Sequence, residues 1–123
     1  MTKILIIGYS SLVKRRIIST LKRNNIPYDI ASRSKKQKDL NAENWYHGYT
    51  EALNNSNAEI VYISLPNSLH YIWSLRALNK GFHTLVDKPA TINLIQLKTL
   101  IKTAKKRKKI FSEAIFFNYH LQI

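Results

Sequence analysis

The residue best suited to proton chemistry is Lys88, which lies two positions after the predicted strand 82–86 and precedes Pro89. The ring of Pro89 fixes its own φ and also restricts the backbone of Lys88 before it. A rigid, partly desolvated ammonium group at a strand end is suited to transferring a proton or polarising a carbonyl. We therefore take Lys88 as the candidate catalytic residue, against the alternative of an ordinary surface lysine.

A second group of polar residues follows another predicted strand, in Leu65-Pro66-Asn67 and at His70. The imidazole of His70 lies early in a predicted helix, in position to hydrogen-bond a ligand at the carboxyl end of that strand. A lone histidine there is more often a structural hydrogen-bonding group. The sequence leaves both roles open.

A turn that contains one glycine, Gly8-Tyr9-Ser10-Ser11-Leu12, joins the first predicted strand to the first predicted helix. Such a junction presents backbone N–H groups and the positive end of the helix dipole to a phosphate. Against the fingerprint G-x-G-x-x-G, Ser10 replaces the second glycine and Val13 replaces the third. Ser10 adds a side chain where a pyrophosphate approaches the backbone. The turn indicates either a weakened phosphate site or an ordinary connection.

The segment Ser32-Arg33-Ser34 follows the second predicted strand, about twenty residues after the glycine turn. Sites that prefer NAD carry Asp or Glu there, which binds the ribose 2′-hydroxyl. A guanidinium flanked by hydroxyls suits a 2′-phosphate instead, because arginine forms bidentate charge-assisted bonds. The segment therefore favours NADP over NAD, against the alternative of a solvated loop.

The chain has a large excess of positive charge, with 20 Lys and Arg against 7 Asp and Glu and a net charge of +13. Five consecutive basic residues, 105–109, lie at the predicted end of a helix, where cations complement the helix dipole. No aromatic residue or glycine is interleaved with them to stack on bases. We expect a solvated helix end rather than a nucleic-acid site.

The elements that must position these residues alternate between strands and helices. Strands are predicted at residues 3–7, 28–32, 44–46, 59–65, 82–86 and 110–117. Helices are predicted at 10–25, 50–54 and 68–80, and from Asn93, with Gln96 completing a capping pattern, to the basic run. This alternation predicts an α/β fold, a Rossmann-type doubly wound, mostly parallel sheet flanked by helices on both faces.

Length and composition exclude several other classes of protein. A chain of 123 residues holds one domain, so residues 1–123 are treated as a single dinucleotide-binding domain. The absence of cysteine excludes disulfides, thiolate metal sites and cysteine nucleophiles, and we expect no metal site. No apolar run is long enough to span a bilayer or to form a signal-peptide core, which predicts a cytoplasmic protein without a membrane partner.

Several ordered segments resemble the Gfo/Idh/MocA family of NAD(P)-dependent oxidoreductases. Residues 65–70 resemble the family's T-P-N-x-x-H, residues 77–83 resemble A-L-x-x-G-K-H, and residues 87–89 resemble E-K-P, with Leu65 for Thr and Asp87 for Glu. Residues 113–121 resemble E-A-x-x-x-R-Y-H-P, with Asn118 for Arg and Leu121 for Pro. The resemblance covers only the family's N-terminal nucleotide-binding domain, and from it we expect the family's C-terminal substrate domain to be absent.

This resemblance implies that the chain binds a nicotinamide dinucleotide and that Lys88 acts near the reacting carbon. Taken with the residue chemistry, it assigns these residues to the cofactor: Gly8, Tyr9, Ser10, Ser11, Leu12, Ser32, Arg33, Ser34, Leu65, Pro66, Asn67, His70, Asp87 and Lys88. Hydride transfer on a sugar-like or cyclitol-like substrate is expected only if a second domain, such as a separately encoded one, completes the pocket.

The sequence leaves other states and functions of the chain open. A truncated or split form would be inactive alone, and an exposed apolar face would favour a homo-oligomer. The alternative from another class is a basic protein that binds nucleic acid or another polyanion on a Rossmann scaffold. We rank it well below the nucleotide-binding domain.

Overall fold

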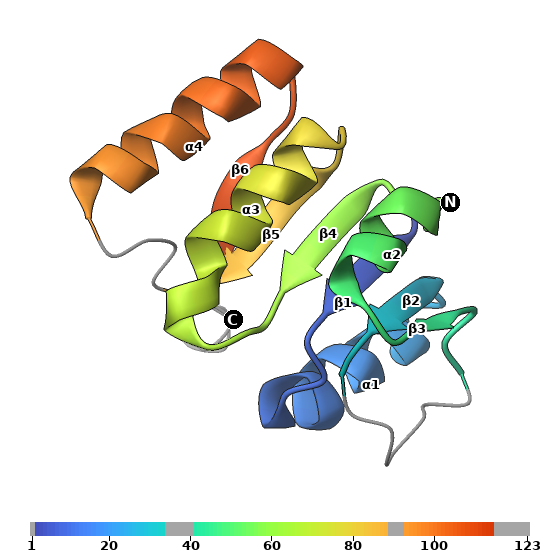
Figure 1. The fold of residues 1–123 in the computed structure, drawn as a ribbon. Helices are drawn as coiled ribbons and strands as arrows, with labels where there is room; N and C mark the ends of the chain where they lie inside the picture. The colour runs from blue at the N-terminus through green and yellow to red at the C-terminus, as the bar shows by residue number, and fades with distance from the viewer. Residues whose placement is uncertain (1, 34–40, 89–92, 115–123) are drawn as a thin grey trace.

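A six-stranded sheet forms the centre of the computed structural model, which describes residues 2–33, 41–88 and 93–114 (Figure 1). The strands are β1 (Ile4–Ile7), β2 (Tyr28–Ala31), β3 (Trp45–Tyr46), β4 (Ile60–Ile63), β5 (His83–Asp87) and β6 (Phe111–Ala114). The helical elements are η1 (Val13–Ile17), α1 (Ile18–Arg23), α2 (Tyr49–Asn55), η2 (Asn67–Leu69), α3 (His70–Asn79) and α4 (Leu94–Arg107). These bounds agree with the predicted elements to within a few residues, and residues 115–117 of the last predicted strand lie outside the described part.

The strand order is β3-β2-β1-β4-β5-β6, and every neighbouring pair is parallel. The chain moves outward from β1 to β3 on one side and from β4 to β6 on the other. The order therefore reverses between β1 and β4, which is where open α/β sheets bind ligands. The predicted Rossmann-type, doubly wound sheet is confirmed.

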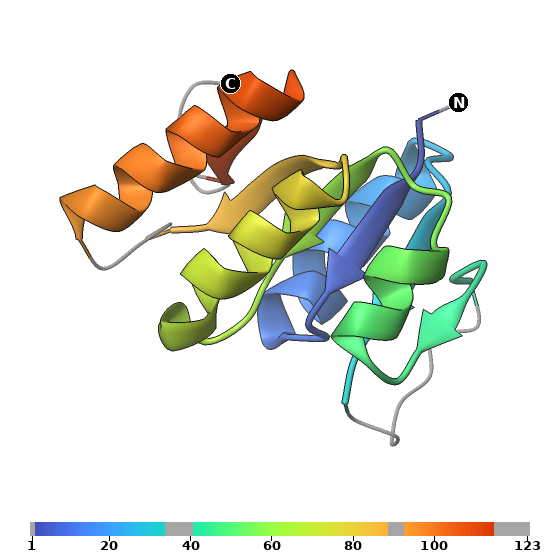
Figure 2. The same cartoon turned by 45° about the horizontal axis from the view of Figure 1, so that its top comes forward.

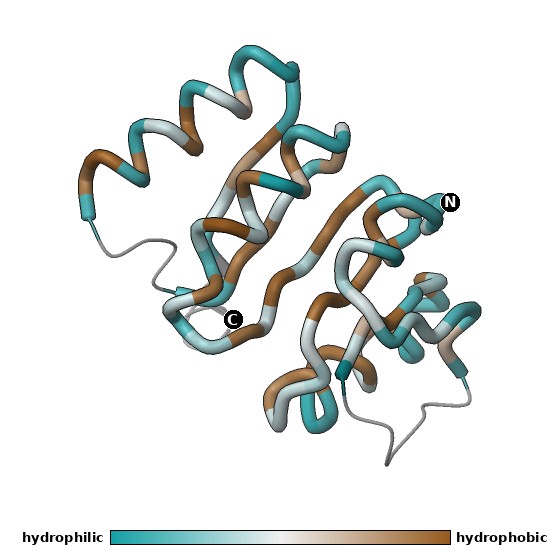
Figure 3. Tube along the Cα trace, in the orientation of Figure 1, coloured by the Kyte–Doolittle hydropathy of each residue, from teal (hydrophilic) through white to brown (hydrophobic). Residues whose placement is uncertain are grey.

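Helices cover both faces of the sheet, as predicted. The helix made of η1 and α1 packs on one face, around Ile6, Ile30 and Tyr62, whereas α2 and α3 pack on the opposite face (Figures 1 and 2). The helix α4 packs on α3 through Leu100 and Ala104. Hydrophobic residues concentrate on the central strands of the sheet (Figure 3).

The first helix departs from the regular helix that the sequence predicts. Its segment η1 is a π-helix, in which the N–H of Ile18 reaches the carbonyl of Val13. Bonding between residues five apart brings positions four and five apart to the same side of the helix. Val13, Ile17 and Ile18 are consequently all buried against the sheet.

The ends of the helices follow the expected chemistry. The side chain of Asn93 accepts a hydrogen bond from the N–H of Gln96 at 2.9 Å, so the predicted cap of α4 is confirmed. Gly81, just after α3, has a φ of +93°, the left-handed backbone that suits a glycine stop. No helix in the described ranges is long and apolar enough to cross a membrane.

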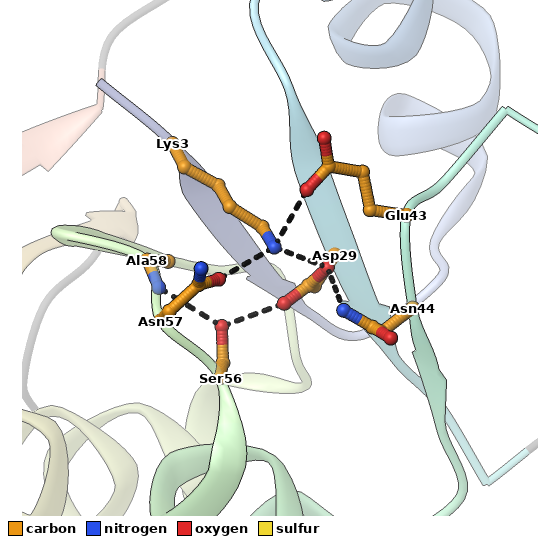
Figure 4. A network of polar contacts seen from close by, with 7 residues as sticks. All are labelled: Lys3, Asp29, Glu43, Asn44, Ser56, Asn57 and Ala58. Atoms are coloured by element: carbon orange, nitrogen blue, oxygen red, sulfur yellow. Dashed lines mark hydrogen bonds and ion pairs between the residues drawn. The ribbon is translucent and has the colours of Figure 1, made fainter. Parts of the chain in front are cut away.

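A buried ion pair joins the beginning of β1 to β2 (Figure 4). The ammonium of Lys3 lies 3.0 Å from the carboxylate of Asp29, which is fully buried, and 2.8 Å from that of Glu43. Ser56 and Asn44 donate further hydrogen bonds to Asp29. Burial lowers the pKa of Lys3, but its hydrogen bonds and attraction to Glu43 and Asp29 outweigh burial and raise the pKa above its ordinary value.

Candidate functional site

The candidate residues gather at the carboxyl edge of the sheet. In the parallel register, Ile7 at the end of β1 lies beside Ala31 of β2 and Ile63 of β4, and Ile63 lies beside Val86 of β5. The next residue along each strand therefore emerges at the same edge. Gly8, Ser32, Ser64 and Asp87 are those residues, and Gly8 and Ser64 flank the point where the strand order reverses.

Gly8 makes the tight turn out of β1. Its φ is +102°, which L-residues with a side chain rarely adopt, and a Cβ at this position would lie 2.2 Å from the carbonyl oxygen of Ser64. The N–H of Gly8 donates to the carbonyl of Ala31 at 2.9 Å. The glycine thus lets the turn lie directly against the end of β4.

Ser10 directs its hydroxyl toward the protein and caps the helix. Its Oγ accepts a hydrogen bond from the N–H of Val13 at 3.2 Å and lies 2.6 Å from the Oγ of Ser64. Around it, Tyr9 packs edge-on against Trp45, Ser11 is exposed and Leu12 is half-buried. The Ser10 side chain is folded back toward β4 rather than extended away from the turn.

A chain of hydrogen bonds continues from Ser10 into the sheet. Ser64 donates to one oxygen of Asp87 at 2.7 Å, and the phenol of Tyr62 donates to the other. Because the proton of Ser64 goes to the carboxylate, Ser10 must be the donor to Ser64. Burial, followed by the hydrogen bond to Asp87, strongly raises the pKa of Tyr62, so this phenol stays protonated.

Ser64 and Tyr62 were not among the residues selected from the sequence. Their spacing of two along β4 places both side chains on one face of the strand, and this spacing is visible in the sequence. Their partner Asp87 belongs to the neighbouring strand, and only the register of β4 with β5 brings it alongside.

Ser32 and Arg33 emerge from β2 at the same edge. Ser32 is buried, and its N–H donates to the carbonyl of Tyr46 at 2.9 Å. Arg33 is exposed, and its guanidinium lies over the ring of Tyr49, 5.4 Å from the centroid. Ser34, the third residue of this predicted group, lies outside the described residues.

The segment after β4 is held by the imidazole of His70. This side chain is 1% exposed, and its Nε2 lies 2.6 Å from the carbonyl oxygen of Leu65. A carbonyl oxygen only accepts, so Nε2 carries the proton. Leu65 is half-buried, whereas Pro66 and Asn67 are exposed at the start of η2. The contact gives His70 a structural role in shaping this loop.

Lys88 is exposed and directly follows Asp87 at the end of β5. The hydrogen bonds of Asp87 to Tyr62 and Ser64 fix the backbone from which the lysine extends. Pro89, which the sequence predicts to make Lys88 rigid, lies outside the described residues. Within the described part, no three His, Asp or Glu side chains form a group that could hold a metal ion.

The arrangement has features that open α/β sheets use to bind dinucleotides. A glycine turn leads into a helix at the switch point of the sheet, where a phosphate meets backbone N–H groups. The end of β2, where dinucleotide sites contact the adenosine ribose, carries a guanidinium. The exposed ammonium of Lys88 lies on the other side of the switch point.

Comparison with known proteins identifies a single family. The model of an oxidoreductase family with an NAD-binding Rossmann fold, GFO_IDH_MocA, matches residues 2–115. A dTDP-3,4-didehydro-2,6-dideoxy-alpha-D-glucose 3-reductase from Streptomyces violaceoruber is 34% identical over 98 residues, which cover 76% of this chain and 29% of that protein. A D-xylose 1-dehydrogenase (NADP(+)) from Hypocrea jecorina is 34% identical over 60% of this chain and 19% of its own length.

Solved structures agree with this assignment. A 3-ketoreductase from Actinomadura kijaniata, crystallised with TDP-benzene and NADP, superposes with a TM-score of 0.87 at 29% identity. The match covers 98% of this chain and 40% of that one. This chain therefore spans between about a fifth and two fifths of the length of the relatives described here.

Proposed function

The chain belongs to the Gfo/Idh/MocA family of oxidoreductases, as an NAD(P)-binding Rossmann domain, and from this premise we propose that it prefers NADP to NAD. The observation that carries the proposal is Arg33, which extends from the end of β2 where an NAD-preferring site has a carboxylate. A carboxylate there would repel a 2′-phosphate, whereas a guanidinium attracts it and offers two parallel N–H donors.

The rest of the site supports nucleotide binding at the same edge of the sheet. The Gly8 turn and the first turn of the helix that follows provide backbone N–H groups for the pyrophosphate. Ser10 does not block this approach, because its hydroxyl is bonded to Ser64 on the protein side. We therefore expect its replacement of the fingerprint's second glycine to be compatible with binding.

The proposed reaction is hydride transfer on a sugar-like or cyclitol-like substrate. The bound nicotinamide supplies the hydride chemistry, and the exposed ammonium of Lys88 supplies a proton donor or a polarising charge beside it. The sugar class is supported by the relatives, a sugar-nucleotide reductase and a xylose dehydrogenase. We propose that turnover requires a substrate-binding region in addition to the residues of this chain.

Isothermal titration calorimetry of the chain with NADPH and NADH tests the cofactor proposal. We expect NADPH to bind more tightly, and Arg33→Ala to weaken NADPH by about tenfold or more while changing NADH little, since a charged hydrogen bond contributes about 1.5–3 kcal/mol. Arg23→Ala is the matched control, because Arg23 is exposed at the far end of the same crossover, where α1 ends. Equal binding of both dinucleotides to the wild type and to Arg33→Ala would overturn the preference for NADP.

A further inference from the structure

Arg33 is held in place by an aromatic ring rather than extending freely into solvent. Its guanidinium carbon lies 5.4 Å from the centroid of the Tyr49 ring, within the range of a cation–π contact. Tyr49 is the first residue of α2, so the contact joins the end of β2 to another element. An exposed arginine on a loop otherwise samples many rotamers, and ordering it on binding costs free energy.

The ring of Tyr49 is itself fixed. It packs edge-on against Trp73 of α3, with ring centroids 5.2 Å apart and an interplanar angle of 85°. Trp73 is buried, and the guanidinium of Arg76 lies 4.6 Å from the centroid of its ring. Both aromatic residues belong to the same core cluster, beside α2 and α3. Arg33 thus contacts a ring that is anchored to the hydrophobic core.

The cation–π contact holds the guanidinium by its charge and does not require any of its N–H groups as a hydrogen-bond donor. The guanidinium has five N–H donors, which lie in its own plane. Those donors form the fork that binds phosphate in a bidentate manner. Tyr49 therefore immobilises Arg33 and leaves the hydrogen-bonding edge of the guanidinium available.

We infer that Tyr49 is a specificity-determining positioning residue, which orders Arg33 for the 2′-phosphate of NADP and thereby raises the NADPH to NADH affinity ratio. The inference rests on the proposed function, because it requires that this edge bind the adenosine ribose. It goes beyond that proposal in placing part of the selectivity on a residue that does not touch the phosphate itself. Tyr49 sits on a different element from Arg33, 16 positions further along the chain.

The affinities of the full chain for NADPH and NADH, measured by calorimetry in a set of variants, test this inference. Tyr49→Leu is expected to lower the affinity ratio by about two- to fivefold, the equivalent of one exposed cation–π contact. NADH affinity should stay near the wild-type value, because NADH has no 2′-phosphate. Tyr49→Phe keeps the ring and is expected to keep the ratio, so it is the matched control.

A double-mutant cycle separates positioning from a general loss of stability. In the Arg33→Ala background, Tyr49→Leu should leave the ratio unchanged, because no guanidinium remains to be ordered. Arg33→Lys keeps the charge but removes the planar group, and it should lower the ratio as the proposed function requires. If Tyr49→Leu does not melt cooperatively, Tyr49→Met takes its place in the cycle.

The outcomes distinguish this inference from the proposed function. A wild-type chain that binds neither dinucleotide overturns both. A wild-type chain that prefers NADPH, together with a Tyr49→Leu variant that folds and keeps the full preference, overturns only the role of Tyr49. A ratio that falls in Tyr49→Leu by the same factor with and without Arg33 also overturns it, because the ring would then act independently of the guanidinium.

Discussion

Gly8 and Gly81 show how the surroundings of a residue decide what its backbone tolerates. Both have a positive φ, +102° and +93°, so a side chain is strained at either position. A Cβ on Gly81 meets nothing within 4 Å, whereas a Cβ on Gly8 would lie 2.2 Å from the carbonyl oxygen of Ser64. The need for glycine at position 8 therefore has two causes, and at position 81 only one.

We expect Gly81→Ala to lower the free energy of unfolding by about 1–2 kcal/mol, the cost of the left-handed backbone. Gly8→Ala should cost at least about 2 kcal/mol more, because the turn must also move away from β4. Denaturation of both variants by urea, with equal slopes, measures the difference. Equal losses in the two variants would contradict the close packing of the Gly8 turn on Ser64.

Because of the phenol of Tyr62, the free energy of unfolding changes with pH in the alkaline range. Burial, followed by its hydrogen bond to Asp87, raises the pKa of Tyr62 in the folded state. The unfolded chain therefore loses this proton first, near its ordinary pKa of about 10, and stability falls as the pH rises above that value. The raised pKa of Lys3 acts in the same direction.

Urea denaturation between about pH 8 and pH 11 is expected to show a falling free energy of unfolding, with the loss beginning near pH 10. Tyr62→Phe removes the tyrosine contribution and should make the decline less steep, leaving the part due to Lys3. The same slope in the wild type and in Tyr62→Phe would show that the phenol titrates alike in the folded and unfolded states.

Among the structural elements, the first two strands depend on a charged contact that only folding creates. Lys3 and Asp29 lie 26 positions apart, and their ion pair joins the beginning of β1 to β2. The Asp29 side chain is fully buried, whereas that of Glu43 is 54% exposed. A buried carboxylate with several donors should matter far more than a solvated one.

Asp29→Ala is expected to destabilise the chain by about 3 kcal/mol, because it leaves the ammonium of Lys3 and the donors of Ser56 and Asn44 without this acceptor. Glu43→Ala, which removes an exposed partner of the same ammonium, should cost less than about 1 kcal/mol. Thermal and urea denaturation of the two variants measure both effects. A larger loss of stability in Glu43→Ala than in Asp29→Ala would contradict the greater importance of the buried carboxylate.

The elements were largely predictable from the sequence because their apolar residues have a clear period. Continuous apolar runs predict β1 and β4, and the helical spacing with an Asn93 cap predicts α4. The π-helical turn was not predictable, since it depends on how Val13, Ile17 and Ile18 fit against the sheet. Local sequence carries no information about that fit.

The candidate site was predictable where it depends on residue type and position in a motif, as for Gly8, Arg33 and Asp87. Its internal contacts were not. Ser64 meets Ser10 and Asp87 through the register of three strands, and Tyr49 meets Arg33 because β3 brings the start of α2 beside the end of β2. Such contacts require the order and register of the strands, which periodicity does not supply.

At the scale of the whole molecule, the excess of positive charge lies in two parts of the chain, residues 1–40 and the helix α4 with the turn after it. Residues 88–112 contain no Asp or Glu, and Lys105, Lys106 and Arg107 are exposed in the last turn of the helix. In the parallel sheet, this end of α4 lies toward the amino end of β6, away from the candidate nucleotide site. A polyanion attracted here would therefore not compete with the cofactor directly.

Oligonucleotide binding and NADPH binding should respond differently to salt and to mutation. Binding of a single-stranded oligonucleotide is expected to fall steeply between about 50 and 200 mM salt, independently of sequence. The double variant Lys105→Ala/Lys106→Ala should weaken that binding and leave NADPH affinity unchanged. Fluorescence anisotropy with a labelled oligonucleotide, paired with calorimetry, checks both. Loss of NADPH affinity in this variant would contradict the separation of the two surfaces.

A thermal-shift titration tests the proposal that the folded chain is a dinucleotide-binding domain that prefers NADP. A ligand that binds the folded state raises the unfolding midpoint, and the rise grows with the logarithm of the ligand concentration relative to its Kd. We predict a cooperative melt whose midpoint rises with NADPH and rises less with NADH at equal concentration. A cooperative melt that neither dinucleotide shifts at millimolar concentration would contradict the claim.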